Sequence, residues 1–178
     1  NVHQSKKLKK ENDYLKSKIS NILIAGQSNF NSQNRIFKAS LRIINAKSID
    51  LFLKIIIEDC PILFDTDIIY AYSNNKILTN IRKQNKFLEI DEKILKKIFI
   101  KNNCINLSNK IEYLPIFFQG TYKVIKSFIL LKIRIDKKYF IIFSIGSKDK
   151  NKFSTKQRGE LINFFIKICE YKIKNLIY

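Results

Sequence analysis

The 178-residue sequence predicts an α+β protein in which helices pack against one face of an antiparallel sheet, preceded by an extended N-terminal helical segment. Three observations support this prediction. Apolar residues near the N-terminus recur every seven positions, which is typical of a helix with a single partner. Two neighbouring segments in the C-terminal half alternate apolar and polar residues, as paired strands do. The last segment is apolar at helical spacing, and a hydrophobic content of 46% is enough to form a core.

The first predicted helix carries a narrow apolar stripe. Its residues recur every seven positions, with one at an intermediate position, and are Leu8, Leu15, Ile22 and Ile19. Polar residues, mostly lysines, lie between them, so the stripe is too narrow for a core helix and suits one partner helix. We therefore predict that residues 1–30 form a dimerisation segment and that residues 31–178 form the folded domain.

Two more helices are predicted before the sheet. An apolar face predicts a second helix over residues 32–46, either separate from the first or continuous with it. Ser48 is a suitable N-cap for a third helix that runs from Ile49 to about Cys60. Proline disrupts the hydrogen bonds of a helix interior, so Pro61 is predicted to end this helix.

The middle of the chain gives weaker signals. Alternation over residues 68–73 predicts a strand, and residues 77–81 are a weaker candidate for a second strand. Asp91 is expected to cap a short helix that extends through Phe99. The segment from residue 102 to residue 122 is ambiguous, with a short helix over 111–118 interrupted by a proline.

A hairpin and a final helix close the predicted fold. Residues 124–135 and 139–145 form the two strands of the hairpin, which we place at the centre because both carry apolar residues on each face. A capping box over residues 154–157 begins a helix that ends near Leu176. Its apolar stripe is broader than one contact with a sheet needs, which indicates a second contact.

The composition leaves the meaning of the charge open. The net charge of +19 suggests nucleic acid or an anionic surface as a partner, and nucleic-acid binding is the alternative function. Most of the basic residues are lysines rather than the arginines that favour bidentate phosphate recognition. Isoleucine, lysine and asparagine have AT-rich codons, so a biased genome explains this composition without selection for a basic surface. We favour the second explanation, in which the excess lysines lie on solvated faces and do not form a binding surface.

The cysteines and the hydropathy pattern indicate in which cellular compartment the protein is expected. Cys60, Cys104 and Cys169 lie far apart among apolar neighbours, which is typical of free buried thiols. No apolar run is long enough to span a bilayer. These observations predict a cytoplasmic protein.

Four groups of residues are weighed as sites, and a structural role is the preferred interpretation of each. In the loop 146–149, Ser147 and Lys148 are possible anion donors; alternatively Gly146 supplies backbone freedom, Asp149 closes an Asx turn and Phe153 fills the core. The other groups are possible phosphate, base and metal contacts respectively: Lys6, Lys7, Lys9 and Lys10; Tyr70, Tyr72 and Tyr139; and Glu58, Asp59, Asp65 and Asp67.

No arrangement of residues predicts catalysis. His3 is the only histidine and has no plausible partner near the start of the chain. No serine–histidine, cysteine–histidine or paired-carboxylate pattern is found. We therefore predict a protein that is not an enzyme, with no catalytic residues, no metal, no cofactor and an unknown ligand.

Two stretches resemble a known family. Residues 37–50 resemble the helix–Ala-x-Ser–helix junction of GAF-like domains. Gly146, Ser147, Asp149 and Phe153 form a Gly-Ser-x-Asp-x-x-x-Phe element similar to the ending of domain of unknown function family 484, a group of uncharacterised bacterial proteins. Lys150 stands where proline is usual in that family. The resemblance implies a GAF-like fold with a helical N-terminal extension, and it implies no activity.

These expectations combine into a functional hypothesis. The chain is expected to be a dimeric GAF-like module for signalling, sensing or protein interaction, with a ligand pocket formed by the loops of residues 102–122. The dimer is expected to use the N-terminal stripe and the C-terminal stripe around Ile162, Ile166 and Ile173. Because Lys6–Lys10 would repel their symmetry mates, the N-terminal helices are expected to cross, run antiparallel or pack on the partner's domain.

Overall fold

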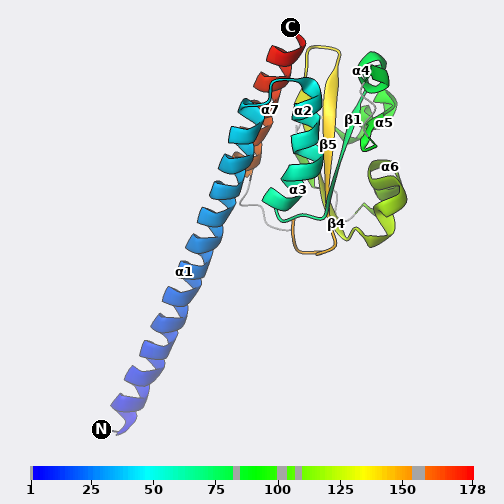
Figure 1. Ribbon diagram of the computed structural model, residues 1–178. Coiled ribbons are helices and arrows are strands. Elements are labelled where there is room, and N and C mark those ends of the chain that lie inside the picture. The colour runs from blue at the N-terminus through cyan, green and yellow to red at the C-terminus, as the bar shows by residue number, and fades with distance from the viewer. Residues whose placement is uncertain (1, 82–84, 100–103, 107–109, 154–158) are drawn as a thin grey trace. The chain divides into compact units, whose positions relative to one another are not determined.

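The chain divides into two compact units, Asn1–Arg35 and Ile36–Tyr178, which are considered separately. The computed structural model describes residues 2–81, 85–99, 104–106, 110–153 and 159–178 (Figure 1). Helix α1 extends over Val2–Ile44 without interruption, so the predicted helix over 32–46 continues the first one. Residues 2–35 of α1 belong to the first unit, and its last turns belong to the second.

A five-stranded sheet forms the centre of the second unit, in the order β2-β1-β5-β4-β3. The α+β class is therefore confirmed, and the predicted hairpin β4–β5 lies in the middle of the sheet. Strand β5 pairs antiparallel with both β1 and β4. The strands are β1 Ile68–Ser73, β2 Phe87–Glu89, β3 Cys104–Asn106, β4 Ser127–Arg134 and β5 Phe140–Ser147.

The segment after β1 differs from the prediction. Residues 77–81, expected as a strand, lie in helix α4, Lys76–Ile81. Asn75 begins this helix, because its side-chain Oδ1 accepts from the Leu78 N–H at 3.1 Å. The next strand is β2, which pairs parallel with β1, so the sheet is mixed rather than purely antiparallel. Residues 77–81 are therefore helical because the Asn75 cap favours a helix more strongly than their weak alternation favours a strand.

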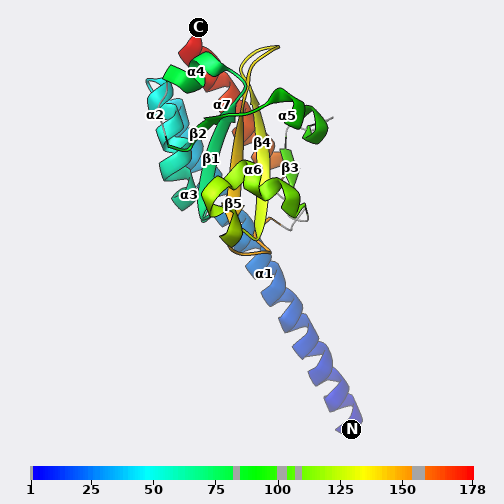
Figure 2. The same ribbon diagram turned by 90° about the vertical axis from the view of Figure 1, so that its right-hand side faces the viewer.

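Helices cover both faces of the sheet, where the prediction placed them on one. One face carries α2 Ile49–Lys54, α3 Cys60–Leu63, α7 Gly159–Ile177 and the end of α1; the other carries α5 Glu92–Ile98 and α6 Leu114–Phe118 (Figures 1 and 2). Strand β4 explains this arrangement: Ile129 and Leu131 enter one core, and Phe128 and Leu130 enter the other. A strand that is apolar on both faces must be covered on both.

Helical structure continues through Pro61, contrary to the prediction. After α2, a π-helical turn spans Ile55–Asp59, and the Cys60 N–H bonds the Ile55 carbonyl. Pro61 then lies in the first turn of α3, where a missing N–H removes no internal hydrogen bond. Pro115 occupies the same position in α6, so it begins that helix instead of interrupting it.

Helix α7 obtains its second contact within the chain. It packs against β4 and against α2, which buries Phe165, Ile166, Cys169 and Ile173. Two residues of the predicted C-terminal dimer patch, Ile166 and Ile173, are only 1% and 0% exposed. That patch is therefore unavailable to a partner, and this part of the dimer prediction is wrong. The predicted capping box at 154–157 lies outside the described residues.

Two of the three cysteines are buried free thiols, as predicted. Cys60 and Cys169 lie in the core that α2 and α7 cover. Burial raises the pKa of the Cys60 thiol to about 12, so it stays protonated and unreactive at neutral pH. The side chain of Cys104 lies outside the described residues.

Candidate functional site

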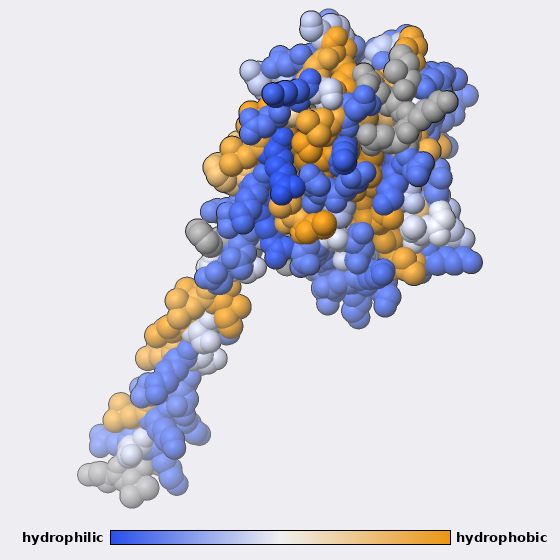
Figure 3. Space-filling model, viewed as in Figure 1, coloured by the Kyte–Doolittle hydropathy of each residue, from blue (hydrophilic) through white to orange (hydrophobic). Residues whose placement is uncertain are grey.

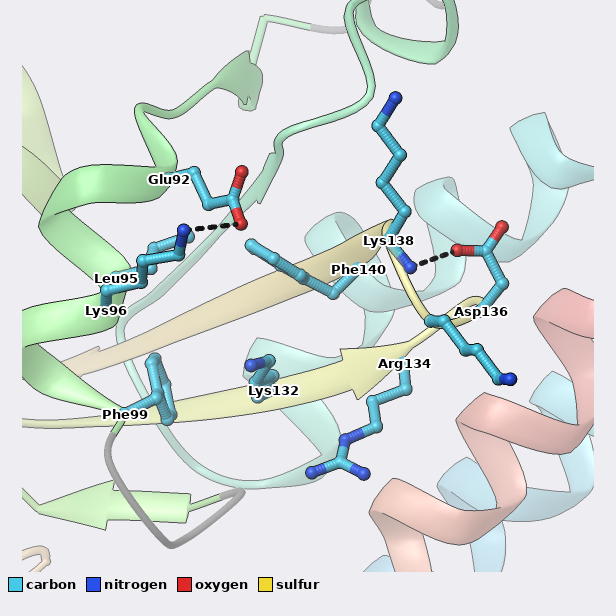
Figure 4. A pocket seen from close by; sticks show the side chains of 10 residues that line it. Glu92, Leu95, Lys96, Phe99, Lys132, Arg134, Asp136, Lys138 and Phe140 are labelled. Atoms are coloured by element: carbon cyan, nitrogen blue, oxygen red, sulfur yellow. Dashed lines mark hydrogen bonds and ion pairs between the residues drawn. The ribbon is translucent and has the colours of Figure 1, made fainter.

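A basic cavity of about 410 Å³ lies between α5 and the tip of the β4–β5 hairpin. Figure 4 shows its walls, with α5 on one side and the two strands on the other. Five lining side chains are cationic, two are acidic and three are apolar. They are Lys96, Lys132, Arg134, Lys137 and Lys138; Glu92 and Asp136; and Leu95, Phe99 and Phe140. We call this cavity the hairpin pocket.

Local structure brings these side chains together. Strand alternation places Lys132 and Arg134 on the α5 side of β4, because Ile133 and Ile135 point into the opposite core. The carboxylate of Asp91 accepts from the Lys93 N–H at 2.8 Å and so fixes the start of α5. Residues three, four and seven positions apart share one face of a helix, so Glu92, Leu95, Lys96 and Phe99 all line the pocket.

Lys132 lies between two aromatic rings in the floor of the pocket (Figure 4). Its Nζ is 4.8 Å from the ring centroid of Phe140 and 5.8 Å from that of Phe99. Burial lowers the pKa of Lys132, and the nearby Arg134 guanidinium lowers it further, while Glu92 acts in the opposite direction. An added anion would counter both effects that disfavour the charged ammonium.

The two carboxylates of the pocket already have hydrogen-bond or ion-pair partners. Asp136 closes the hairpin turn, because its Oδ1 accepts from the backbone N–H groups of Lys138 and Tyr139, each at 2.7 Å. These bonds lower the pKa of Asp136, and the Tyr178 hydroxyl adds a third. Glu92 forms an ion pair with Lys96 at 3.4 Å. Within the described part of the chain, Arg134 and Lys138 form no ion pair, so the pocket favours an anion.

The loop 146–149 instead binds a carboxylate of its own chain. The Lys148 N–H and the Ser147 hydroxyl donate to Asp67 Oδ2 at 2.7 and 3.3 Å. The Asp149 carboxylate accepts from the Asn151 N–H at 2.9 Å, which is the predicted Asx turn. The Lys148 N–H and the Ser147 hydroxyl are therefore already used, which supports the structural interpretation of this loop.

Gly146 has a different role from the predicted one. Its φ is not positive, so the residue is not required for backbone freedom. A Cβ at this position would lie 2.6 Å from Phe118 Cε1 and 3.0 Å from Ile125 Cδ1. Glycine is needed because the α6 side packs directly on the strand. Phe153 is partly buried and packs against the core under α7, close to its predicted role.

The strand tyrosines are not a platform for bases. Tyr70 and Tyr72 are 7% and 2% exposed, and the ring of Tyr72 meets Phe117 of α6 edge to face at 5.7 Å. Tyr139 is half-buried beside the hairpin turn. Because α6 covers this face of the sheet, the two strand tyrosines are core residues, more deeply buried than predicted.

The remaining candidate residues do not converge. Asp59 pairs with Arg42 at 2.9 Å, and Asp65 pairs with Lys152 at 3.4 Å, while Glu58 is exposed. The described residues contain no cluster of three or more histidine, cysteine, aspartate or glutamate side chains that could hold a metal. Each of the lysines at the start of α1 is exposed: Lys6, Lys7, Lys9 and Lys10. The side chain of His3 lies outside the described residues.

The hairpin pocket was not predicted from the sequence. The expected ligand pocket, from the loops of 102–122, lies partly outside the described residues, and over 114–118 the chain is helix α6, whose phenylalanines fill the core. The missed signal was the presence of Lys132 and Arg134 on a central strand. Charged side chains on a central strand need solvent or a polar cavity, and here Arg134 is exposed while Lys132 is half-buried.

Comparison with known proteins gives no family: no family model matches the chain, and no curated protein matches it. Among the described helices, none combines the length and apolar character that crossing a membrane requires.

Proposed function

We propose that the protein is a non-catalytic, GAF-like sensory module that binds a small anionic ligand in the hairpin pocket. One observation carries this proposal: five cationic and only two acidic side chains line the cavity, so cations remain in excess after Lys96 pairs with Glu92 and Asp136 bonds the turn. The cavity volume of about 410 Å³ falls in the range of small-molecule sites.

The lining suggests a ligand with two parts. Arg134 and the hairpin lysines suit a phosphate or carboxylate group, since a guanidinium donates two parallel hydrogen bonds to such anions. Phe99 and Phe140 offer apolar ring surface to a flat group. A phosphorylated ligand with a planar ring therefore fits the chemistry of the pocket better than an inorganic ion.

The family resemblance is consistent with this proposal. The α+β architecture and the long N-terminal helix are what a GAF-like domain with a helical extension would have. In the proposal the module acts as a homodimer in the cytoplasm and contacts its second copy through the exposed face of α1, since the C-terminal patch is buried.

The pocket can be tested with two probes, pyrophosphate and ATP. Thermal unfolding and calorimetry at about 150 mM salt should show binding of ATP, and weaker binding of pyrophosphate. The variant Arg134→Ala/Lys138→Ala should weaken ATP binding at least tenfold, because two of the five pocket cations are removed. The matched control Lys54→Ala/Lys174→Ala removes the same charge from exposed positions on α2 and α7.

Equal losses in both double variants would show that ATP senses only the overall charge of the protein, and would overturn the pocket assignment. Binding of neither probe at millimolar concentration would overturn the proposal for phosphorylated ligands. A loss confined to the pocket variant supports it.

Nucleic-acid binding is the second candidate, favoured by the net charge of +19. Exposed lysines nevertheless occur on α1, α2, α4, α5 and α7 rather than on one element, which fits solvated faces better than a dedicated interface. A 30-base-pair DNA duplex in filter binding at physiological salt separates the two. Weak binding that falls steeply with salt is expected, and sub-micromolar, sequence-selective binding would favour the nucleic-acid function.

A further inference from the structure

The N-terminal part of α1 presents an apolar face that is exposed to solvent. Leu8, Leu15, Ile19 and Ile22 have exposed fractions of 65%, 56%, 58% and 69%. In Figure 3 apolar surface interrupts the hydrophilic surface of this part of α1. Leaving four large aliphatic side chains in water forgoes their burial, so a face of this kind marks an interaction surface.

The spacing of this face fits a two-stranded coiled coil. In a heptad written abcdefg, Leu8, Leu15 and Ile22 take d positions, and Asn12 and Ile19 take a positions. Leucine at d with a β-branched residue at a, as at Leu15 and Ile19, favours two parallel strands, while the polar a residues Ser5 and Asn12 specify register at a cost in stability. We infer that residues 5–25 of α1 form a parallel, in-register coiled coil with a second copy of this chain.

Charge complementarity selects the second copy and the parallel direction. In a parallel pair, each g residue faces the e residue of the partner's next heptad. The facing pairs are Gln4 with Lys9, Glu11 with Lys16, and Lys18 with Leu23. None of these pairs is like-charged, and the second is an ion pair made twice in the dimer. In an antiparallel pair e faces e, which sets Lys9 and Lys16 against each other.

The basic cluster does not oppose this arrangement, although repulsion between its lysines was expected to. Lys6, Lys7 and Lys10 take b, c and f positions on the outside of the pair, and only Lys9 borders the seam. The expectation of crossed or antiparallel helices treated the cluster as a block. Heptad positions place most of its charge in solvent.

Disulfide formation tests direction and register in the full chain. Asn12→Cys places a thiol at an a position, where the two copies meet, and Ser17→Cys places one at an f position on the outside. Both variants are made with Cys104→Ser, since Cys60 and Cys169 are buried. Under mild oxidation at about 50 μM protein, the Asn12→Cys chain should cross-link at least tenfold faster than the Ser17→Cys chain.

A charge exchange keeps the inference testable if either cysteine variant fails to fold. Glu11→Lys and Lys16→Glu should each raise the dimer Kd about fivefold, because each breaks two ion pairs and creates two like-charged contacts. The double variant should restore the wild-type Kd, measured by sedimentation. Restoration supports the parallel arrangement, and additive losses overturn it.

This inference rests on the homodimer of the proposed function, and the outcomes separate the two. A dimer in sedimentation that cross-links equally at both positions overturns the parallel register and leaves the homodimer. A monomer at about 100 μM overturns both. Neither result bears on the hairpin pocket, whose test measures ligand binding.

Discussion

The two ends of strand β5 both present donors that could bind an anion, but their surroundings differ. At its C-terminal end, the donors of Ser147 and Lys148 bind the Asp67 carboxylate from the loop before β1. At its N-terminal end, five cations outnumber the two carboxylates of the hairpin pocket, and Asp136 bonds the backbone of the turn and attracts Lys138. An external anion is therefore expected at the end where cations outnumber the carboxylates of the chain, and not at the end where a carboxylate of the chain already binds the donors.

The largest effect is expected at the C-terminal end, where the backbone itself is packed. Gly146→Ala should lower the free energy of unfolding by about 1–3 kcal/mol, since the new Cβ overpacks against the Phe118 ring. Gly120→Ala is the matched control, because a Cβ there has nothing within 4 Å, and it should change stability by about 0.5 kcal/mol or less. Urea unfolding measures both. Equal costs would show that Gly146 is not held by this contact.

Removing the internal anion should cost less. Asp67→Ala leaves the Lys148 N–H and the Ser147 hydroxyl without their acceptor and should destabilise by about 1–2 kcal/mol. Glu112→Ala removes the same charge from an exposed position and should have a smaller effect. If the two variants unfold at the same urea concentration, the carboxylate does not hold the loop.

At the other end of β5, the turn should respond to acid. The backbone hydrogen bonds hold the pKa of Asp136 below its ordinary value of 3.8. A carboxyl with a lowered pKa stabilises the fold fully above the unfolded-state value, and this contribution is lost as the pH falls below about 3.8 through the folded-state value. Asp136→Asn should therefore lose less stability than the wild type between pH 5 and pH 3 in urea unfolding (roughly the window set by the unfolded-state pKa). An unchanged pH dependence would contradict this role.

The smallest change in stability is expected at the pocket floor. Lys132→Met keeps the aliphatic stem and removes an ammonium whose pKa burial has lowered, so the urea midpoint should stay the same or rise slightly. ATP binding should nevertheless weaken. A large loss of stability would show that Lys132 is a structural residue and would remove the contrast between the two ends of β5.

Local signals were enough for many of the elements. The Asp91 cap, the alternation of β1 and the hairpin around Asp136 each depend on residues close in sequence. The Asx turn at Asp149 was predicted for the same reason. The errors occurred where a local signal had two meanings: Pro61 can end a helix or begin one, and residues 77–81 are apolar enough for either a strand or a helix.

The candidate site was beyond this kind of inference. Alternation alone places Lys132 and Arg134 on the face of β4 opposite Ile133, but it does not show what covers that face. Once α5 covers it, the same two cations become the wall of a pocket. Tyr72 differs from its prediction for the same reason. It was expected to be a half-buried strand tyrosine, but it is a core residue because α6 packs on it.

The sequence by itself determined the α+β class, the central hairpin, the buried cysteines and the heptad face of α1, because periodicity and caps act over one or two turns. Only the tertiary structure decided that helices cover both faces, that β2 joins in parallel, that Asp67 occupies the donors of the 146–149 loop and that the hairpin cations share a cavity. These features depend on which distant groups meet, and Asp67 and Lys148 lie 81 residues apart in the chain. No local sequence pattern predicts a contact between residues so far apart, because the packing of the whole second unit determines it.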